Sequence, residues 1–281
     1  MSRLVIEAEH TEGAYWSDLW RYRELFFFLS WRDILVRYKQ TTIGVLWALI
    51  RPLLTIVIFT VVFGKLAQMP SGGIPYPILV CAAALPWQFF ASAMSEASNS
   101  LLANANMLNK IYFPRLIVPA SAVIVSFTDL LISLVILAAF MAGYHVMPTW
   151  RLCTLPLFTA LAMFAALGAG FWLSALNVKY RDFRYVIPFI VQFGFFLSPV
   201  GFSNEVIVQR LGLVKFGEAI YLLYSVNPMV GVINGFRWAV GGQTVAMDWN
   251  SVAISVLVVT LITVSGLRYF RATEETFADI I

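Results

Sequence analysis

The chain has 281 residues, of which 60% are apolar and only 12% are charged, and its mean hydropathy is +0.80. A soluble domain carries about 25% charged residues, so this composition excludes a large soluble catalytic domain and indicates a membrane protein with several spans. The net charge of +4 does not indicate nucleic-acid binding, because the basic residues gather in alternate loops between the apolar stretches.

Motifs for intrinsic catalysis and for metal binding are absent from the sequence. The nearest fragment to a phosphate-binding loop, Gly64-Lys65, has Phe59 where the first glycine is required. Both histidines lie outside the apolar stretches, and both cysteines lie within them without metal-binding spacing. We therefore expect a chain that is not an enzyme and that has no catalytic residue, no metal site and no cofactor of its own.

The N-terminal region divides into an acidic tail, residues 1–14, and an amphipathic stretch, residues 15–42. The tail lacks the basic start and apolar core of a cleavable leader. In the stretch, tryptophans alternate with charged residues, which suits a helix at the membrane surface. Ser30-Trp-Arg-Asp33 has the form of a capping box, which would restart the helix there. The predicted interface residues are Trp31, Arg32, Asp33, Arg37 and Lys39.

Residues 43–281 are expected to form one membrane domain. Apolar stretches long enough to cross a bilayer lie at about 43–64, 75–95, 116–142, 153–176 and 249–267, and a shorter one lies at about 186–203. Thirteen Lys and Arg residues fall in the segments on the N-terminal side, five fall on the other side, and Arg51 lies inside the first span. This bias predicts six spans with both termini in the cytoplasm.

Two charged residues lie deep in the predicted spans. Counted from the inner span ends at ~1.5 Å per residue, Arg51 lies roughly 12 Å deep and Asp129 roughly 20 Å deep. We therefore expect the two to form an ion pair between the first and third spans. The alternative is a direct role for Asp129 in transport, since a buried carboxylate can serve a proton step.

Residues 98–115 join the second and third spans. A serine cap at the start and Pro114 at the end predict a helix of about four turns on the inner side. Leu101, Leu108 and Ile111 lie close to one side of this helix, so that face can insert into a groove of a partner. The alternative is an ordinary loop between spans.

Small and aromatic residues give two further expectations. Small residues recur at steps of four in the fourth span, which favours close packing within the bundle, with self-association as the alternative. They are Ala162, Ala166, Gly170 and Ser174. Aromatic residues, 15% of the chain, cluster near span ends and are expected mostly at the membrane interface. The alternative is that some line a passage, and the candidates are Trp87, Phe89, Phe90, Phe195 and Phe196.

The segment 204–248, between the fifth and sixth spans, does not have the pattern of a plain loop. Asn227-Pro228 has the form of a helix start, and Gly241-Gly242 has the form of a helix end. We expect two short outer helices over about 205–241, either interfacial or re-entrant. The alternative is a seventh span near 219–240, which would bury Asn227 and Arg237 and place the C-terminus outside.

A series of short motifs runs along almost the whole chain beyond residue 14. It comprises Trp31-Arg-Asp33, Gly44-Val-Leu-Trp47, Asn109-Lys-Ile-Tyr-Phe-Pro-Arg115, Tyr180-Arg-Asp182, Ser198-Pro-Val200, Asn227-Pro-Met229 and Thr276-Phe-Ala-Asp-Ile280. In this order and spacing the motifs resemble type-2 ABC exporter permeases, most closely those that export lipid-linked O-antigen and related surface polysaccharides. Arg51 departs from the pattern, because a neutral polar residue is usual at its position.

The resemblance implies an all-α integral membrane protein of six spans that forms a homodimer in the bacterial inner membrane. Two separate ATP-binding cassette ATPase subunits would join it, and these would bind ATP and Mg. The short inner helix would couple the ATPase to the channel through Leu101, Asn104, Leu108, Lys110, Tyr112, Phe113 and Arg115.

The resemblance also implies a periplasmic gate formed by the outer helices, with Asn227, Pro228, Phe236 and Arg237 as its residues. Arg237 would attract the phosphate linkage of a lipid-linked polymer or anchor the gate to lipid headgroups.

Teichoic acid, capsular polymer, lipid and drug remain alternative cargoes. A gradient-driven flippase or transporter without an ATPase partner is the other class of function.

Overall fold

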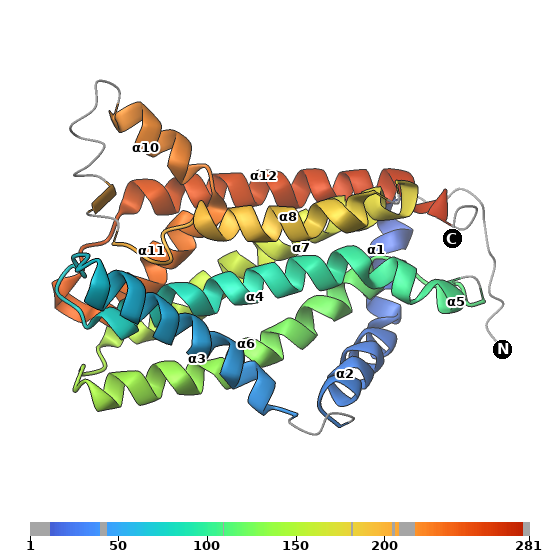
Figure 1. Ribbon diagram of the computed structural model, residues 1–281. Helices are drawn as coiled ribbons and strands as arrows, with labels where there is room; N and C mark the ends of the chain where they lie inside the picture. The colour runs from blue at the N-terminus through green and yellow to red at the C-terminus, as the bar shows by residue number, and fades with distance from the viewer. Residues whose placement is uncertain are drawn as a thin grey trace.

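The computed structural model describes residues 12–39, 44–108, 110–180, 182–203, 206–207 and 217–277. Within these residues every regular element is a helix (Figure 1), as expected for an all-α membrane protein. The α-helices are α1 (Glu12–Arg21), α2 (Arg23–Lys39), α3 (Leu46–Phe59), α4 (Tyr76–Ala103), α5 (Ala105–Leu108), α6 (Ile117–Gly143), α7 (Leu155–Lys179), α8 (Phe183–Phe196), α10 (Gly217–Ser225), α11 (Pro228–Gly241) and α12 (Trp249–Glu274). Shorter 3-10 or π turns are η1 (Thr60–Leu66), η2 (Trp150–Thr154) and η3 (Gly242–Thr244).

Five helical segments are long and apolar enough to cross a bilayer. They are Leu46–Leu66, Tyr76–Ala103, Ile117–Gly143, Trp150–Lys179 and Trp249–Glu274. These segments coincide with the five long apolar stretches of the sequence. The sixth stretch forms α8, whose 14 residues extend only about 21 Å before the chain turns, less than the ~30 Å hydrocarbon core. The structure thus has five long apolar helices and one short apolar helix, in agreement with five long stretches and a shorter sixth in the sequence.

The outer segment contains a sharply bent helix pair. The side-chain oxygen of Asn227 accepts a hydrogen bond from the N–H of Met229 at 3.0 Å, and Pro228 is the first residue of α11, which confirms the predicted helix start. The helical segments Ala219–Ser225 and Pro228–Thr244 meet at 87°, so one straight span over 219–240 is excluded. The first of the two predicted outer helices falls largely outside the described residues.

Figure 1 shows α4, α6, α7, α8 and α12 side by side along the long axis of the molecule. Helices α1, α2 and α5 lie toward one end, here named the α5 end, and α10 and α11 lie at the opposite end, here named the α11 end. Helix α4 is central, because it packs against α3, α6, α7, α8 and α11, and its residues 78–87 are all buried. The core therefore lies around α4.

Small residues of α7 permit the closest helix contacts. All four members of the predicted stripe are buried, and a Cβ atom at Gly170 would lie 2.7 Å from the Cβ of Ala97 on α4. On the other side of α7, a Cβ atom at Gly168 would lie 2.7 Å from the backbone of Thr263 on α12. The stripe thus packs α7 within the bundle, as its spacing predicts.

The amphipathic N-terminal region forms two helices, α1 and α2, separated at Tyr22. Ser30 lies inside α2, where its hydroxyl donates to the carbonyl of Phe26 at 2.8 Å. A serine that bonds back to the preceding turn does not cap a new helix, so the predicted restart at Ser30 is wrong. The acidic tail up to residue 11 and the join to the first span, residues 40–43, lie outside the described residues.

Candidate functional site

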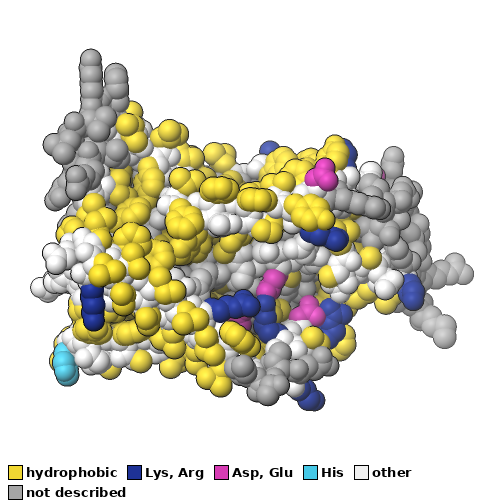
Figure 2. All heavy atoms as spheres, in the orientation of Figure 1, with side chains coloured by type: hydrophobic (Ala, Val, Ile, Leu, Met, Phe, Trp, Pro, Cys, Tyr) yellow, Lys and Arg dark blue, Asp and Glu magenta, His cyan; other side chains and the backbone are white. Residues whose placement is uncertain are grey.

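A cavity of about 950 Å³ opens between α2, α3, α4, α6 and α8. In Figure 2 it corresponds to a hollow across the middle of the face, with apolar side chains above and below it and with basic and acidic side chains gathered inside. Helix α3 contributes Trp47, Ala48, Arg51, Pro52 and Thr55, which recur at steps of three or four residues. One face of the first span therefore lines the cavity.

Aromatic rings from α4 and α8 form one wall of this cavity. Four of the five predicted passage residues, Trp87, Phe89, Phe195 and Phe196, line it. The ring centroid of Trp87 lies 6.1 Å from that of Phe195, so the two helices meet through their rings. Phe90 is not among the lining residues and packs against Trp87 from behind, at 5.6 Å.

Amide and hydroxyl groups supply polar positions on the same walls. The side-chain amide of Gln88 on α4 donates to the hydroxyl of Thr55 on α3 at 3.2 Å. Ser92, one turn further along α4, and Gln192 on α8 also line the cavity. The cavity thus combines flat apolar surfaces with neutral hydrogen-bonding groups.

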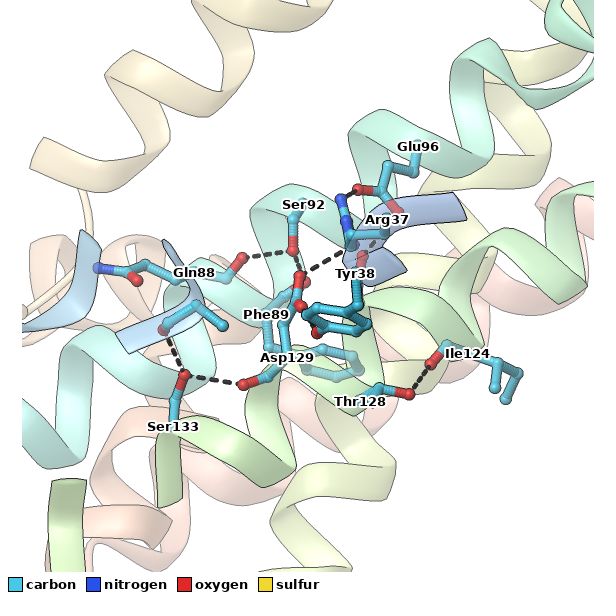
Figure 3. A network of polar contacts seen from close by, with 12 residues as sticks. Arg37, Tyr38, Gln88, Phe89, Ser92, Glu96, Ile124, Thr128, Asp129 and Ser133 are labelled. Carbon is cyan, nitrogen blue, oxygen red and sulfur yellow. Dashed lines mark hydrogen bonds and ion pairs between the residues drawn. The ribbon is translucent and has the colours of Figure 1, made fainter. Parts of the chain in front are cut away.

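A network of charges contributes to the cavity lining through Arg37, Tyr38 and Asp129 (Figure 3). Arg37 on α2 forms an ion pair with Asp129 on α6 at 2.9 Å and a second one with Glu96 on α4. The hydroxyl of Tyr38 donates to Asp129, and that of Ser126 donates to Glu96 at 3.0 Å. Burial, followed by the hydrogen bond to Asp129, raises the pKa of Tyr38, so this side chain stays protonated as a donor. Three helices are therefore joined through one guanidinium.

The predicted ion pair between Arg51 and Asp129 is wrong, because Asp129 pairs with Arg37 instead. The reason lies in the register of the parallel helices α3 and α6. The hydroxyl of Ser133 donates to the carbonyl of Ala48 at 2.9 Å, which sets these two residues at the same level. Arg51 follows Ala48 by about one turn and Asp129 precedes Ser133 by about one turn, so they are roughly 10 Å apart along the axes.

Glu96 is a member of the network that the sequence pattern does not identify. The apolar stretch of the second span ends near residue 95, which places Glu96 in the following loop. In the structure α4 continues to Ala103, and the side chains of Ser98, Asn99 and Ser100 find hydrogen-bond partners within the helix, on the carbonyls of the preceding turn. The run of polar residues after the apolar stretch is thus still helical.

The remaining interface residues anchor α2 on the end of α4. The Arg32 guanidinium lies 2.7 Å from the Asp33 carboxylate and donates to the side-chain oxygen of Asn104 at 3.0 Å. Trp31 and Lys39 are exposed on the outer face of the same helix. Helix α2 therefore packs on the bundle by one face and presents tryptophan and lysine on the other, as an interface helix requires.

The predicted four-turn helix over 98–115 is wrong. Helix α4 ends at Ala103, α5 has only four residues, and turns follow. Leu101, Leu108 and Phe113 are buried at 0%, 8% and 4% exposure, in a cluster with Phe270 and Phe277. These apolar residues fold the segment back onto the bundle rather than forming a free face.

Among its described residues, the segment exposes Ala103 and Asn106 and then the three consecutive residues Lys110, Ile111 and Tyr112. Ile111 is 60% exposed and Tyr112 is 54% exposed, so two large apolar side chains lie next to a cation at the α5 end. An exposed apolar patch beside a charge is typical of a protein contact. Of the predicted coupling residues, Lys110 and Tyr112 are therefore exposed, next to Ile111 of the predicted apolar face.

Glu274, the last residue of α12, ties this end of the molecule together. Its carboxylate accepts a hydrogen bond from the backbone N–H of Arg115 at 2.7 Å and another from the hydroxyl of Tyr15 on α1 at 2.9 Å. The Arg115 guanidinium donates to the carbonyl of Glu274. Helix α1, the segment before α6 and the end of α12 therefore meet at one side chain.

The outer residues Phe236 and Arg237 are buried, with 0% and 4% exposure. The Arg237 guanidinium donates to the carbonyls of Leu79, Phe202, Pro199 and Val200. In this structure the guanidinium of Arg237 therefore contacts backbone carbonyls, not the phosphate linkage or the lipid headgroups expected from the sequence. The turn after α8 leaves carbonyls without helical partners, and Arg237 satisfies them.

Comparison with known proteins agrees with this architecture. The O-antigen export system permease protein RfbA of Myxococcus xanthus is 23% identical to this chain over 265 residues, which are 94% of this chain and 98% of that protein. Two proteins of the same name from Klebsiella pneumoniae are 25% and 26% identical over 256 residues, 89% of this chain and 92% of theirs. Residues 24–240 match the family described as ABC-2 type transporter.

That match includes α2, the cavity, the charge network and the bent outer pair, and it covers most of the 281 residues. The helices, the apolar composition and the matched relatives agree on a membrane subunit that works with an ABC ATPase. The chain therefore belongs to the ABC-2 type transporter family, as a multi-pass membrane subunit of an ABC exporter.

Proposed function

We propose that this chain forms the translocation channel of an ATP-driven exporter of lipid-linked polysaccharide of the O-antigen class. The observation that carries the proposal is the cavity of about 950 Å³ between the spans. Its size is at the upper end of the ~300–1,000 Å³ range of small-molecule sites. Aromatic faces that can stack on the C–H faces of sugars form one wall, and amides and hydroxyls lie on the others. The names of the relatives support the same cargo.

The working assembly in this proposal is a homodimer with two ATPase subunits in the bacterial inner membrane. The ATPases bind ATP and Mg, and this chain is non-catalytic. The excess of Lys and Arg in the segments at the α5 end supports a cytoplasmic location for that end and for both termini. The α11 end, with its bent helix pair, then faces outward as the gate.

In this proposal the ATPase contacts the subunit at the α5 end and transmits its movement there. Ile111 and Tyr112 form the exposed contact, and Glu274 joins the adjoining segment to α1 and α12. From there the Arg37 network connects α2 to α4 and α6, the helices that line the cavity. A movement of the ATPase is thereby transmitted to the cavity walls through side chains that are in contact.

The test is export in cells that lack their own permease and express this chain with its ATPase. Phe196 lines the cavity and is 68% exposed, so Phe196→Ala removes an aromatic face without opening the core. We expect less polysaccharide at the cell surface at an equal amount of permease. Phe164→Ala is the matched control, because Phe164 is 52% exposed on α7 outside the cavity. Absence of surface polysaccharide with the wild-type chain would contradict the proposal.

A further inference from the structure

Arg51 is a charged side chain in the cavity that the established architecture does not use. It lies on the cavity-lining face of α3 and is exposed there. Among the residues that the structure describes, no carboxylate pairs with it, since Arg37 holds both Glu96 and Asp129. A guanidinium that faces an apolar-walled space within a membrane span is costly unless an anion accompanies it.

Two contacts place Arg51 between the polar wall and the charge network. Thr55, one turn beyond Arg51, accepts a hydrogen bond from Gln88, and Ala48, about one turn before it, accepts one from Ser133. Ser92, one turn from Gln88 on α4, also lines the cavity. The guanidinium therefore lies beside the amide of Gln88 and the hydroxyls of Thr55 and Ser92, and both hydroxyls already donate to backbone carbonyls of the preceding turn.

Both carboxylates of the network are already satisfied. Asp129 accepts from Arg37 and Tyr38, and Glu96 accepts from Arg37 and Ser126. Arg51 thus remains available to a ligand. A guanidinium binds phosphate and carboxylate through paired, charge-assisted hydrogen bonds, and the neighbouring amide group of Gln88 can add a donor to such a site.

We infer that Arg51 is the anion-binding residue of the cavity and that the cargo passing it carries a phosphate or carboxylate group. The inference rests on the proposed function and adds to it that the cargo is anionic where it meets α3. The phosphate source is the linkage of the polymer to its lipid, and the carboxylate source is an acidic sugar. Both are bound by the same guanidinium.

A competing role for Arg51 is long-range charge balance. The network holds two carboxylates and one guanidinium, which leaves one excess negative charge that Arg51 compensates at a distance. In that case Arg51 acts on the network and not on a ligand. The two roles differ in the effect of Asp129→Asn, which removes the excess charge.

The experiment measures equilibrium binding of radiolabelled probes to the purified complex of the full chain with its ATPase. The probes are farnesyl pyrophosphate, its neutral counterpart farnesol, a glucuronic-acid oligosaccharide and a glucose oligosaccharide. Arg51→Gln is expected to weaken binding of at least one anionic probe by about tenfold or more, because a charged hydrogen bond is lost. Arg184→Gln, which removes an exposed arginine of α8 outside the cavity, is the matched control and is expected to change nothing.

The pattern of losses identifies the anion. A loss for farnesyl pyrophosphate supports the inference with the lipid linkage as its source, and a loss for the glucuronic-acid probe alone supports it with an acidic sugar. Unchanged binding of both anions overturns the inference, as does an equal loss for the neutral probes. Restoration of anion binding by Asp129→Asn in the Arg51→Gln background also overturns it in favour of charge balance.

The export assay separates this inference from the proposed function. If the wild-type chain exports polysaccharide while Arg51→Gln leaves anion binding unchanged, the inference fails and the function stands. If anion binding depends on Arg51 but no polysaccharide reaches the surface, the function fails and the anion site stands.

Discussion

The guanidinium of Arg37 lies 2.9 Å from the carboxylate of Asp129, and this pair joins the amphipathic helix α2 to α6 beside the cavity. The same guanidinium holds Glu96 of α4. Because α2 is linked in this way to two cavity-lining helices, a movement of α2 displaces them as well. The contact therefore connects α2 to the inside of the bundle.

Removal of Arg37 should be costly, because it leaves two carboxylates without their cation. The side chains of the Arg37–Asp129 pair are 32% and 26% exposed. We therefore expect Arg37→Gln to lower the free energy of unfolding by about 1–3 kcal/mol, between the values for exposed and buried pairs. Asp129→Asn should cost less, and the double variant should lose less than the sum of both. Unfolding in mixed micelles measures these values.

The control for the network is Arg23→Gln, an exposed arginine at the start of α2. Its effect should stay within about 0.5 kcal/mol. Strictly additive losses in the Arg37 and Asp129 variants would show that the two side chains are not energetically coupled.

Exposed and buried residues of the segment at the α5 end should respond differently to a charge. Ile111→Asp should weaken ATPase association and lower export while the amount of permease stays normal, because Ile111 is 60% exposed. Leu108→Asp should instead lower the amount of folded permease, because it places a carboxylate in the buried cluster. Co-purification of the ATPase and quantitative detection of the permease measure both effects. Normal ATPase binding by the Ile111→Asp variant would show that Ile111 does not contribute to the contact with the ATPase.

Close contact between α7 and α12 should make Gly266 sensitive to a single methyl group. A Cβ atom at Gly266 would collide with the backbone carbonyl of Gly168 and lie 2.9 Å from Trp172. We expect Gly266→Ala to lower the free energy of unfolding by about 1–3 kcal/mol. Gly143→Ala is the matched control, since nothing lies within 4 Å of its Cβ position, and its effect should stay within about 0.5 kcal/mol. Equal effects of the two variants in mixed micelles would argue against the helix contact.

Tyr15 should make the fold sensitive to alkaline pH. Burial, followed by the neighbouring carboxylate of Glu274, raises the pKa of Tyr15 above its ordinary value of 10.0. Below that value the tyrosine is neutral in both states and its contribution to stability is complete. Above it the unfolded chain ionises while the folded chain does not, so stability falls as the pH rises through the folded-state pKa.

The check is Tyr15→Phe, which should show a smaller loss of unfolding free energy between about pH 9 and pH 11 than the wild-type chain does. The wild-type excess should be at most about 1.4 kcal/mol per pH unit. Identical pH slopes for the two proteins would mean that Tyr15 ionises as readily in the folded state as in the unfolded one.

Local signals were sufficient to predict helices and some helix ends. Asn227 and Pro228 identified the start of α11, because capping depends only on neighbouring residues. The partner of Asp129 was not predictable, since residue counting gives an approximate depth but not the register of α3 on α6. The burial of Arg237 depends on carbonyls freed by the turn after α8, which no periodicity in the sequence reveals.

The most direct test of the account is photo-crosslinking from inside the cavity during export. A benzoylphenylalanine at Thr55, which lines the cavity, is compared with one at Leu157, which is 69% exposed on α7 outside it. We expect a polysaccharide adduct at position 55 and not at position 157, formed when the ATPase is active. Adducts at 157 alone, or none at 55 in complexes that export polysaccharide, would contradict the assignment of this cavity as the translocation path.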